Sequence, residues 1–325
     1  QTNEDLTTEM SEATLPVLTL YDGKTAINEL YGYTEKMDAA YMRDTITPVG
    51  EDRLLPVTVQ TYHTAVDKIS YEIRSLDAQR LIANADVTSY TENKGMISME
   101  LPIQNLLEKN EEYLLVIQLE SGDRMIYYYT RIIESQNSYV SECIDFVKQF
   151  NDTTFDSEKA ASLSTYMEKT TGDNTTLQYV TLNNSLNQVS WAEFHGTRLT
   201  TPVPSVKEIT STYNVIVLDY VVTRVGQNGQ SEYYNVEEYY RVRYTNTRMY
   251  LLNFERTMEE IFRGENDSIS GNNILLGIRS KDVEYQTNES GKVVAFVQEG
   301  ELWSYNQEAN TLAKVFSFRG YEGVD

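Results

Sequence analysis

The sequence contains a single cysteine, Cys143, among its 325 residues. One cysteine cannot form an intrachain disulfide, and it excludes zinc sites built from several thiolates. Histidine is almost as scarce, because the chain has only His63 and His195 and no HExxH pattern. Ligands for transition metals are therefore largely missing. We expect no metal and no cofactor.

Sequence motifs of the common catalytic machineries are also missing. The chain has no GxSxG, P-loop or GxGxxG pattern. Cys143 lies on the apolar stripe of a predicted helix, where a small buried side chain is expected rather than a nucleophile. Carboxylates are numerous, but a glycosidase pair must lie about 5 to 10 Å apart, and sequence spacing cannot establish that distance. We expect no catalytic residues in this chain.

Positive charge is in short supply, with 27 Lys and Arg against 49 Asp and Glu and a formal net charge of -22. Such a surface repels phosphate backbones and anionic lipid headgroups, so nucleic acid is not expected as a partner. A protein or a carbohydrate remains possible. No apolar run approaches the ~18 residues that a membrane-spanning helix needs, so this segment should make no membrane contact.

The start of the chain suggests its location. Residue 1 is Gln rather than Met, and residues 1–14 are polar, as in a tether left after a signal or anchor has been removed upstream. The near absence of cysteine fits a bacterial exterior as well as a reducing cytosol. We expect an extracellular protein of the bacterial cell surface.

Residues 15–134 are predicted to form an antiparallel β-sandwich. In the segment 69–76 the apolar residues Ile69, Tyr71 and Ile73 alternate with polar ones, the period of a strand with one solvated face. A turn at 121–123 joins two of the predicted strands as a hairpin. The predicted strands are 17–21, 27–33, 55–62, 69–76, 85–90, 96–101, 113–119 and 124–133.

One stretch of this region carries a family resemblance. The segment LEKNEEYLLVIQL places Leu107 six residues before Tyr113, and alternating apolar residues follow. This resembles the tyrosine corner of fibronectin type III and immunoglobulin-like (Ig-like) domains. The resemblance implies that Leu107 packs under the corner and that the Tyr113 hydroxyl reaches a nearby backbone group.

Residues 135–263 are predicted to form an α+β domain that begins with two helices. The first covers 138–150, with Asn137 or Ser138 as its cap and an apolar stripe of Val140, Cys143, Ile144, Val147 and Phe150. Asp156 is expected to cap the second helix, with Phe155 and Ala160 spaced as a hydrophobic staple.

Three strong strand signals follow the helices, at 211–225, 231–244 and 249–255. The first two are joined by residues 226–229, whose Asn-Gly pair accepts the positive φ angles of a tight hairpin. Helices on one face of such a meander loosely resemble nuclear transport factor 2-like (NTF2-like) folds, which sometimes enclose a pocket. That resemblance implies a possible small-ligand site between the helices and the sheet.

Residues 264–325 resemble one blade of the β-propeller families of bacterial surface and periplasmic proteins. Strands are expected at 274–286, 291–298, 301–307 and 311–318, and the third contains the aromatic stretch Leu302-Trp303-Ser304-Tyr305. A lone blade cannot bury both of its faces. Further domains are therefore expected after Asp325. The complete expectation is a multidomain, mostly β protein: a β-sandwich, an α+β domain with two helices on an antiparallel meander, and a short blade-like sheet.

The 25 tyrosines suggest where the protein makes contacts. Tyrosine is an ordinary strand residue, but rows of rings on one sheet face also suit sugars or protein interfaces. Since strand residues alternate between faces, Tyr233, Tyr239, Arg241 and Arg243 should share one side, together with Glu237. Two further candidates in another segment, Trp191 and His195, are placed to line a pocket rim. An ordinary structural role is the competing interpretation for both.

Three functions remain open. The first is a non-catalytic extracellular module of an anchored bacterial surface protein that acts in binding, sensing or spacing. The second is an accessory region of a larger secreted hydrolase whose catalytic domain lies outside this chain. The third is small-ligand binding in a pocket of the α+β domain.

Overall fold

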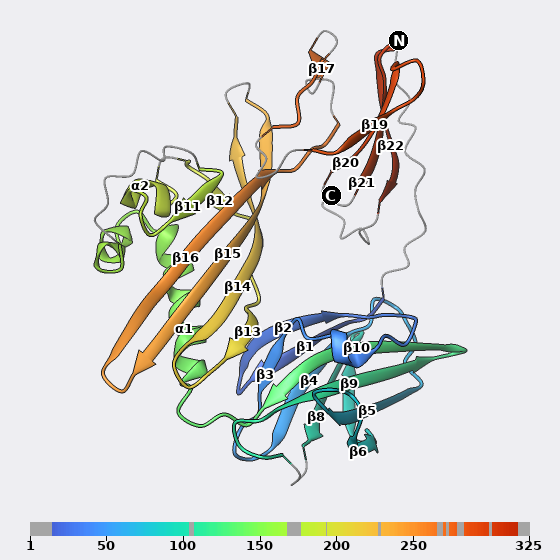
Figure 1. Ribbon diagram of the computed structural model, residues 1–325, viewed down its shortest axis with the longest axis vertical. Helices are drawn as coiled ribbons and strands as arrows, with labels where there is room; N and C mark the ends of the chain where they lie inside the picture. The colour runs from blue at the N-terminus through green and yellow to red at the C-terminus, as the bar shows by residue number, and fades with distance from the viewer. Residues whose placement is uncertain are drawn as a thin grey trace.

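The computed structural model describes residues 15–103, 107–167, 177–192, 194–226, 229–264, 269–270, 273–277, 283–298 and 301–317. Over these residues the fold is mostly β with several antiparallel sheets, which confirms the predicted class. Figure 1 shows a sandwich at one end, three long strands beside a helix in the middle, and a separate small sheet. The predicted tether, 1–14, lies outside the described residues.

The sandwich consists of two five-stranded sheets whose inward side chains share one buried core. One sheet has the order β2 (Thr25–Tyr31), β1 (Val17–Asp22), β4 (Leu54–Gln60), β8 (Met96–Pro102), β7 (Tyr90–Asn93). The other has the order β3 (Ile46–Pro48), β10 (Arg124–Ile133), β9 (Glu112–Ser121), β5 (Lys68–Ser75), β6 (Leu81–Asp86). All of these pairs are antiparallel except β3 with β10, which run parallel.

Most predicted strands of the sandwich are present, and two differences have physical reasons. The segment 85–90 is not one strand, because β6 ends at Asp86 and β7 begins at Tyr90 in the opposite sheet. The chain crosses between sheets there, and the sequence pattern merged two edge strands. The short strand β3 was not predicted, because three residues are too few to show an alternation.

Tyr113 makes the backbone contact that the resemblance implies. The backbone N–H of Glu108 donates to the Tyr113 hydroxyl at 3.0 Å, and both Leu107 and Tyr113 are buried. The hydroxyl thereby satisfies a backbone donor in the turn that precedes β9.

The middle unit is a six-stranded sheet with helices on one side, as Figure 1 shows for α1 (Val140–Thr154). Its order is β11 (Tyr179–Thr181), β16 (Arg248–Glu260), β15 (Ser231–Thr245), β14 (Asn214–Val225), β12 (Thr197–Arg198), and β13 (Ser205–Ile209) also pairs with β14. The 3₁₀-helix η2 (Ala160–Thr165) and the short helix α2 (Leu186–Val189) complete the unit.

The helix ends differ from the sequence-based prediction. Neither Asn137 nor Ser138 caps α1, because the helix follows Tyr139, a left-handed residue without a side-chain capping bond. Ser138 instead shares a hydrogen bond with the Ser135 hydroxyl. Asp156 does accept from backbone N–H groups, as expected for a cap, but the turn that follows leads into a 3₁₀-helix rather than an α-helix.

The terminal unit is an antiparallel meander of β19 (Tyr285–Thr287), β20 (Val293–Gln298), β21 (Glu301–Asn306) and β22 (Thr311–Ser317). The last three strands were predicted. The first was expected over 274–286, but only the two-residue β18 (Asn273–Ile274), paired with β17 (Ile269–Ser270), and β19 occur near its ends. Residues 278–282 lie outside the described part of the chain, as do the expected turns at Asn228 and at 299–300.

Asn28 joins the sandwich to the middle unit. It is fully buried on β2, and its side-chain amide donates to the Ile46 carbonyl and the Thr47 hydroxyl, both at 2.9 Å. Its side-chain oxygen accepts from the Val206 N–H at 2.7 Å, and its own N–H donates to the Pro204 carbonyl. One side chain therefore connects two strands of the sandwich to β13.

Apolar packing and two further polar contacts extend this junction. Ile27, Ile46 and Ile133 of the sandwich belong to the same buried cluster as the core of the middle unit. The Arg131 guanidinium bonds the Lys207 carbonyl across the junction, and Lys207 pairs with Asp44 at 2.8 Å. The two units therefore share a continuous core.

We expect Asn28→Ala to lower the free energy of unfolding by roughly 3 kcal/mol, because the buried Val206 N–H loses its acceptor and the Ile46 carbonyl loses a donor. Amide hydrogen exchange at Val206 should accelerate accordingly. Asn137→Ala is the matched control, since Asn137 is also left-handed, with φ 58°, but is exposed. Equal effects of the two substitutions on stability would contradict this account.

Candidate functional site

Strand β15 divides the middle sheet into two chemically different faces. Its even-numbered residues from 234 to 242 are buried under the helices, and they include Tyr234, Glu238 and Tyr240. Its odd-numbered residues point to the opposite face, where they are half-buried or exposed. The predicted residues Tyr233, Tyr239, Arg241 and Arg243 all have odd numbers, so they lie on this outer face with Glu237.

Arginines stack on tyrosine rings at the end of this face nearest the β15–β16 hairpin. The Arg241 guanidinium lies 3.9 Å from the centroid of the Tyr213 ring. Arg243 and Arg248 each lie 5.0 Å from the Tyr250 centroid. Such stacking holds a guanidinium in place and leaves its edge available for hydrogen bonds. We call these five residues the Arg–Tyr face.

No carboxylate among the described residues forms an ion pair with Arg241 or Arg243. The Nε atom of Arg241 is buried, and it finds no hydrogen-bond partner within the described part of the chain. In a chain with a net charge of -22, unpaired and oriented guanidinium groups are unexpected. They can donate hydrogen bonds to a carboxylate of another molecule.

Tyr239 lies beside Arg241 on the same face. Partial burial raises the pKa of its hydroxyl, so the hydroxyl stays protonated and can donate a hydrogen bond at neutral pH. It pairs across the strands with Glu255 of β16.

Tyr233 is separated from this cluster. Tyr233 and Arg241 are eight residue steps apart along the strand, a distance of about 26 Å. The Arg263 guanidinium lies over the Tyr233 ring, 5.0 Å from its centroid. Between them Glu237 lies directly opposite Asp219 of β14, and partial burial together with this second carboxylate raises the pKa of Asp219. An acidic zone thus divides the outer face.

Trp191 and His195 lie elsewhere. Trp191 is only 5% exposed and stacks on Phe155, with ring centroids 5.3 Å apart. His195 is exposed, and its backbone N–H donates to the Trp191 carbonyl. Trp191 belongs to the helical side of the sheet, opposite the Arg–Tyr face. The six predicted contact residues are therefore divided among three places.

The feature that sequence reasoning missed is a buried carboxylate, Glu238, with no exposed surface. It accepts hydrogen bonds from Arg256 Nε at 2.7 Å, Asn151 Nδ2 at 2.8 Å, Tyr220 at 2.9 Å and Tyr240 at 2.6 Å. Burial, reinforced by this carboxylate, raises the pKa of both tyrosines well above the ordinary value, so they remain donors. Glu238 has the same parity on β15 as the buried Tyr234 and Tyr240, and this shared parity was the signal that could have placed it on the buried face.

Arg256 extends the network to the helices. Its two Nη atoms donate to the carbonyls of Gln188 and Val189 in α2, at 3.2 and 2.8 Å. Its guanidinium also lies 4.2 Å from the centroid of the Trp191 ring. Each of the three nitrogen atoms of Arg256 thus has a partner. The ion pair of Arg256 with Glu238 holds α2 and Trp191 against the sheet.

The described residues contain no group of three or more His, Cys, Asp or Glu side chains that could hold a metal ion. Likewise, none of the described helices has the length and apolarity needed to cross a membrane. The sequence matches no protein-family model and no curated protein.

Replacing Glu238 by Gln should lower the free energy of unfolding by about 3 to 5 kcal/mol, because the Arg256 charge would stay buried without its counter-charge. Glu237→Gln is the control, since it makes the same chemical change one residue away on the exposed face. There we expect a change within about 0.5 kcal/mol, or a slight gain from reduced repulsion of Asp219. Urea unfolding followed by tryptophan fluorescence measures both, and a mild effect of Glu238→Gln would argue against the network.

The Cys143 thiol should be inert in the folded protein. It is fully buried, and burial raises its pKa to about 11. A thiol reagent at mildly alkaline pH should therefore label it only after unfolding. Ser141→Cys, which adds an exposed thiol on the same helix, should react at once with one equivalent. Rapid labelling of native wild-type protein would contradict the burial of Cys143.

Proposed function

We propose that this chain is a non-catalytic, extracellular binding module of an anchored bacterial surface protein and that it engages its partner through the Arg–Tyr face. The observation that carries the proposal is the pair of stacked arginines, Arg241 and Arg243, without carboxylate partners among the described residues. In an otherwise acidic chain they mark a place where an external carboxylate is favoured.

We further propose that the first unit is an Ig-like or fibronectin type III-like sandwich. Two observations support this. The order β1-β4-β8 faces β10-β9-β5-β6, the arrangement of two sheets that these folds use, and the parallel β3 lies at the edge of the second sheet. The hydrogen bond between Glu108 and Tyr113 adds the corner geometry.

The middle and terminal units fit the other two resemblances. Helix α1 packed on a long antiparallel meander supports an NTF2-like arrangement for the middle unit. The four-stranded meander β19–β22 supports a propeller blade. Its exposed Val297 (49%) and Val315 (57%) suit a blade whose second face packs on a further unit.

A carboxylated polysaccharide is the partner that this face suits best. Guanidinium groups bind carboxylates through paired N–H donors, and flat tyrosine rings stack on sugar rings. An uncovered sheet of extended strands also offers a long, level surface to an extended polymer. The acidic zone around Asp219 and Glu237 restricts the footprint to the hairpin end of the face.

The test uses polygalacturonate and its methyl-esterified form, which differ in the charge of the carboxyl groups. Biolayer interferometry should show binding of the charged polymer and weak binding of the ester. The double variant Arg241→Ala/Arg243→Ala should weaken binding about tenfold or more, and added salt should weaken it in the wild type.

The control is Arg80→Ala/Arg124→Ala, which removes two exposed arginines from the sandwich and leaves the Arg–Tyr face intact. It should bind like the wild type. If both double variants bind equally well, the Arg–Tyr face is not the site. If the wild type binds neither polymer, a carboxylated polysaccharide is not its partner.

A further inference from the structure

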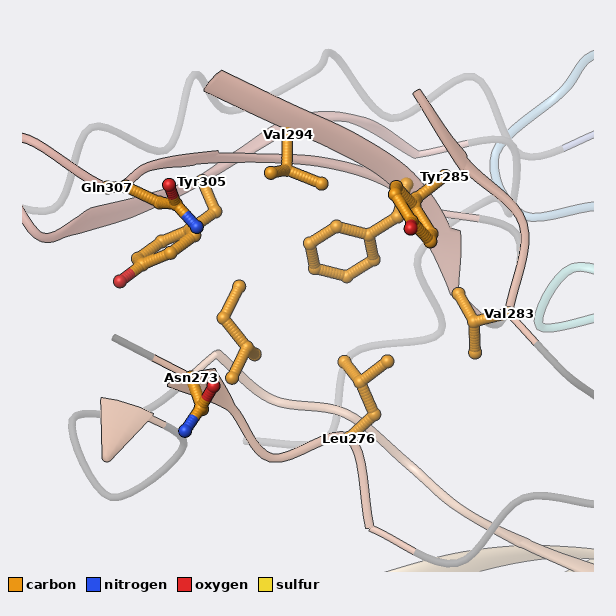
Figure 2. Close-up of a pocket in the computed structure, with 9 residues that line it drawn as sticks. Asn273, Leu276, Val283, Tyr285, Val294, Tyr305 and Gln307 are labelled. Atoms are coloured by element: carbon orange, nitrogen blue, oxygen red, sulfur yellow. The ribbon is translucent and has the colours of Figure 1, made fainter. Parts of the chain in front are cut away.

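The terminal unit contains a cavity of about 460 Å³ that the sequence did not reveal. Figure 2 shows side chains of the β19–β21 sheet on one side and those of residues 273–276 on the other. The volume lies within the range of about 300 to 1,000 Å³ that small-molecule sites in proteins usually have. The cavity is remote from the Arg–Tyr face in sequence and belongs to another sheet.

Strand alternation builds the first wall. On β20 the even-numbered residues Val294 and Phe296 point toward the cavity, and Tyr305 of β21 lies beside them. Phe296 and Tyr305 are buried, and the Phe262 ring packs against Phe296 with centroids 5.8 Å apart. The wall therefore belongs to a packed core.

The second wall, which contains Ile274 and Leu276, ends at a close approach between backbone and side chain. Gly277 has φ +73°, and a Cβ atom there would lie 2.1 Å from the Glu260 carboxylate at the end of β16. Gly264, with φ +67°, allows a similar approach to the Trp303 ring. Only glycine fits these positions, so the segment can lie close to β16 while it faces the sheet.

The lining has a defined polarity. Among the residues that the structure describes, the nine that line the cavity carry no charge, and most are aliphatic or aromatic. In Figure 2 the amides of Asn273 and Gln307 and the Tyr305 ring lie toward one end, and Leu276, Val283 and Tyr285 lie toward the other. An ionised ligand would find no counter-charge in this lining.

We infer that this cavity binds a small, neutral, amphipathic molecule. Its aromatic or aliphatic body lies against Phe296, Val294 and Leu276, where burial of apolar surface drives binding. A single polar group, such as an amide or a hydroxyl, lies at the end where the Asn273 and Gln307 amides can both donate and accept hydrogen bonds.

The probe for the test is N-phenyl-1-naphthylamine, a neutral dye that fluoresces in apolar surroundings. It should bind the wild type at one saturable site. Its sulfonated analogue, 1-anilinonaphthalene-8-sulfonate, has the same rings with an added negative charge and should bind more weakly. If neither dye binds saturably, the cavity is not a ligand site, and if the sulfonate binds as tightly as the neutral dye, the site does not select neutral ligands.

Val294→Phe should fill the cavity and raise the Kd of the neutral dye about tenfold or more. Val297→Phe is the matched control, because it makes the same change on the same strand but on the opposite face, and it should leave the Kd unchanged. Leu276→Phe fills the cavity from the other wall, so loss of binding in both filling variants separates occupation of the cavity from misfolding of one strand. Circular dichroism checks the fold of each variant, and unchanged binding in two folded filling variants would overturn the inference.

Discussion

The middle unit depends on one buried carboxylate. The Glu238 carboxylate accepts hydrogen bonds from side chains of α1, β14, β15 and β16. All four elements must therefore pack together before these bonds offset the cost of burying the charge. Its partner Arg256 then fixes α2 through two backbone carbonyls. Because a fully satisfied ion pair tolerates no shift in register, the network specifies which face of β15 turns inward. The same constraint places Arg241 and Arg243 on the outside.

The junction at Asn28 fixes the position of the middle unit relative to the sandwich. A flexible link would leave the two units independent, but here an amide side chain bonds both bodies and isoleucines of the sandwich enter the core of its neighbour. Buried amides that meet all of their partners favour one relative arrangement over others. The outer face of the middle sheet therefore has a fixed orientation relative to the sandwich.

Alternation of polarity predicted the long elements well. The strands β9, β10, β14 and β15 and the helix α1 were evident from the sequence, because each is long enough to show its period. Short strands such as β3, β11 and β12 were missed, since two or three residues carry no period and are fixed by their neighbours. The failed cap at Asn137 and Ser138 has a similar cause, because Tyr139 takes a left-handed conformation that local sequence did not indicate.

The candidate site was only partly predictable. Strand parity correctly placed Tyr239, Arg241 and Arg243 on one side, but parity cannot show that Tyr213, which precedes β14, stacks on Arg241. The terminal cavity was hidden for a different reason, since its two walls come from segments joined by residues with no strong pattern. Contacts between segments distant in sequence are set by packing, which composition and period do not encode.

The charge distribution explains how an acidic protein can present a cationic site. Coulombic attraction between exposed groups is screened within about 8 Å at physiological ionic strength, so the net charge of -22 acts mainly on the approach of a ligand. At contact, the stacked guanidinium groups dominate, because their tyrosine partners hold them in position and supply no neutralising carboxylate. In the proposed complex, the acidic zone at Asp219 and Glu237 would limit how far an anionic polymer extends along the sheet. On the proposed function, a face with this arrangement would select for a local carboxylate rather than for a uniformly anionic surface.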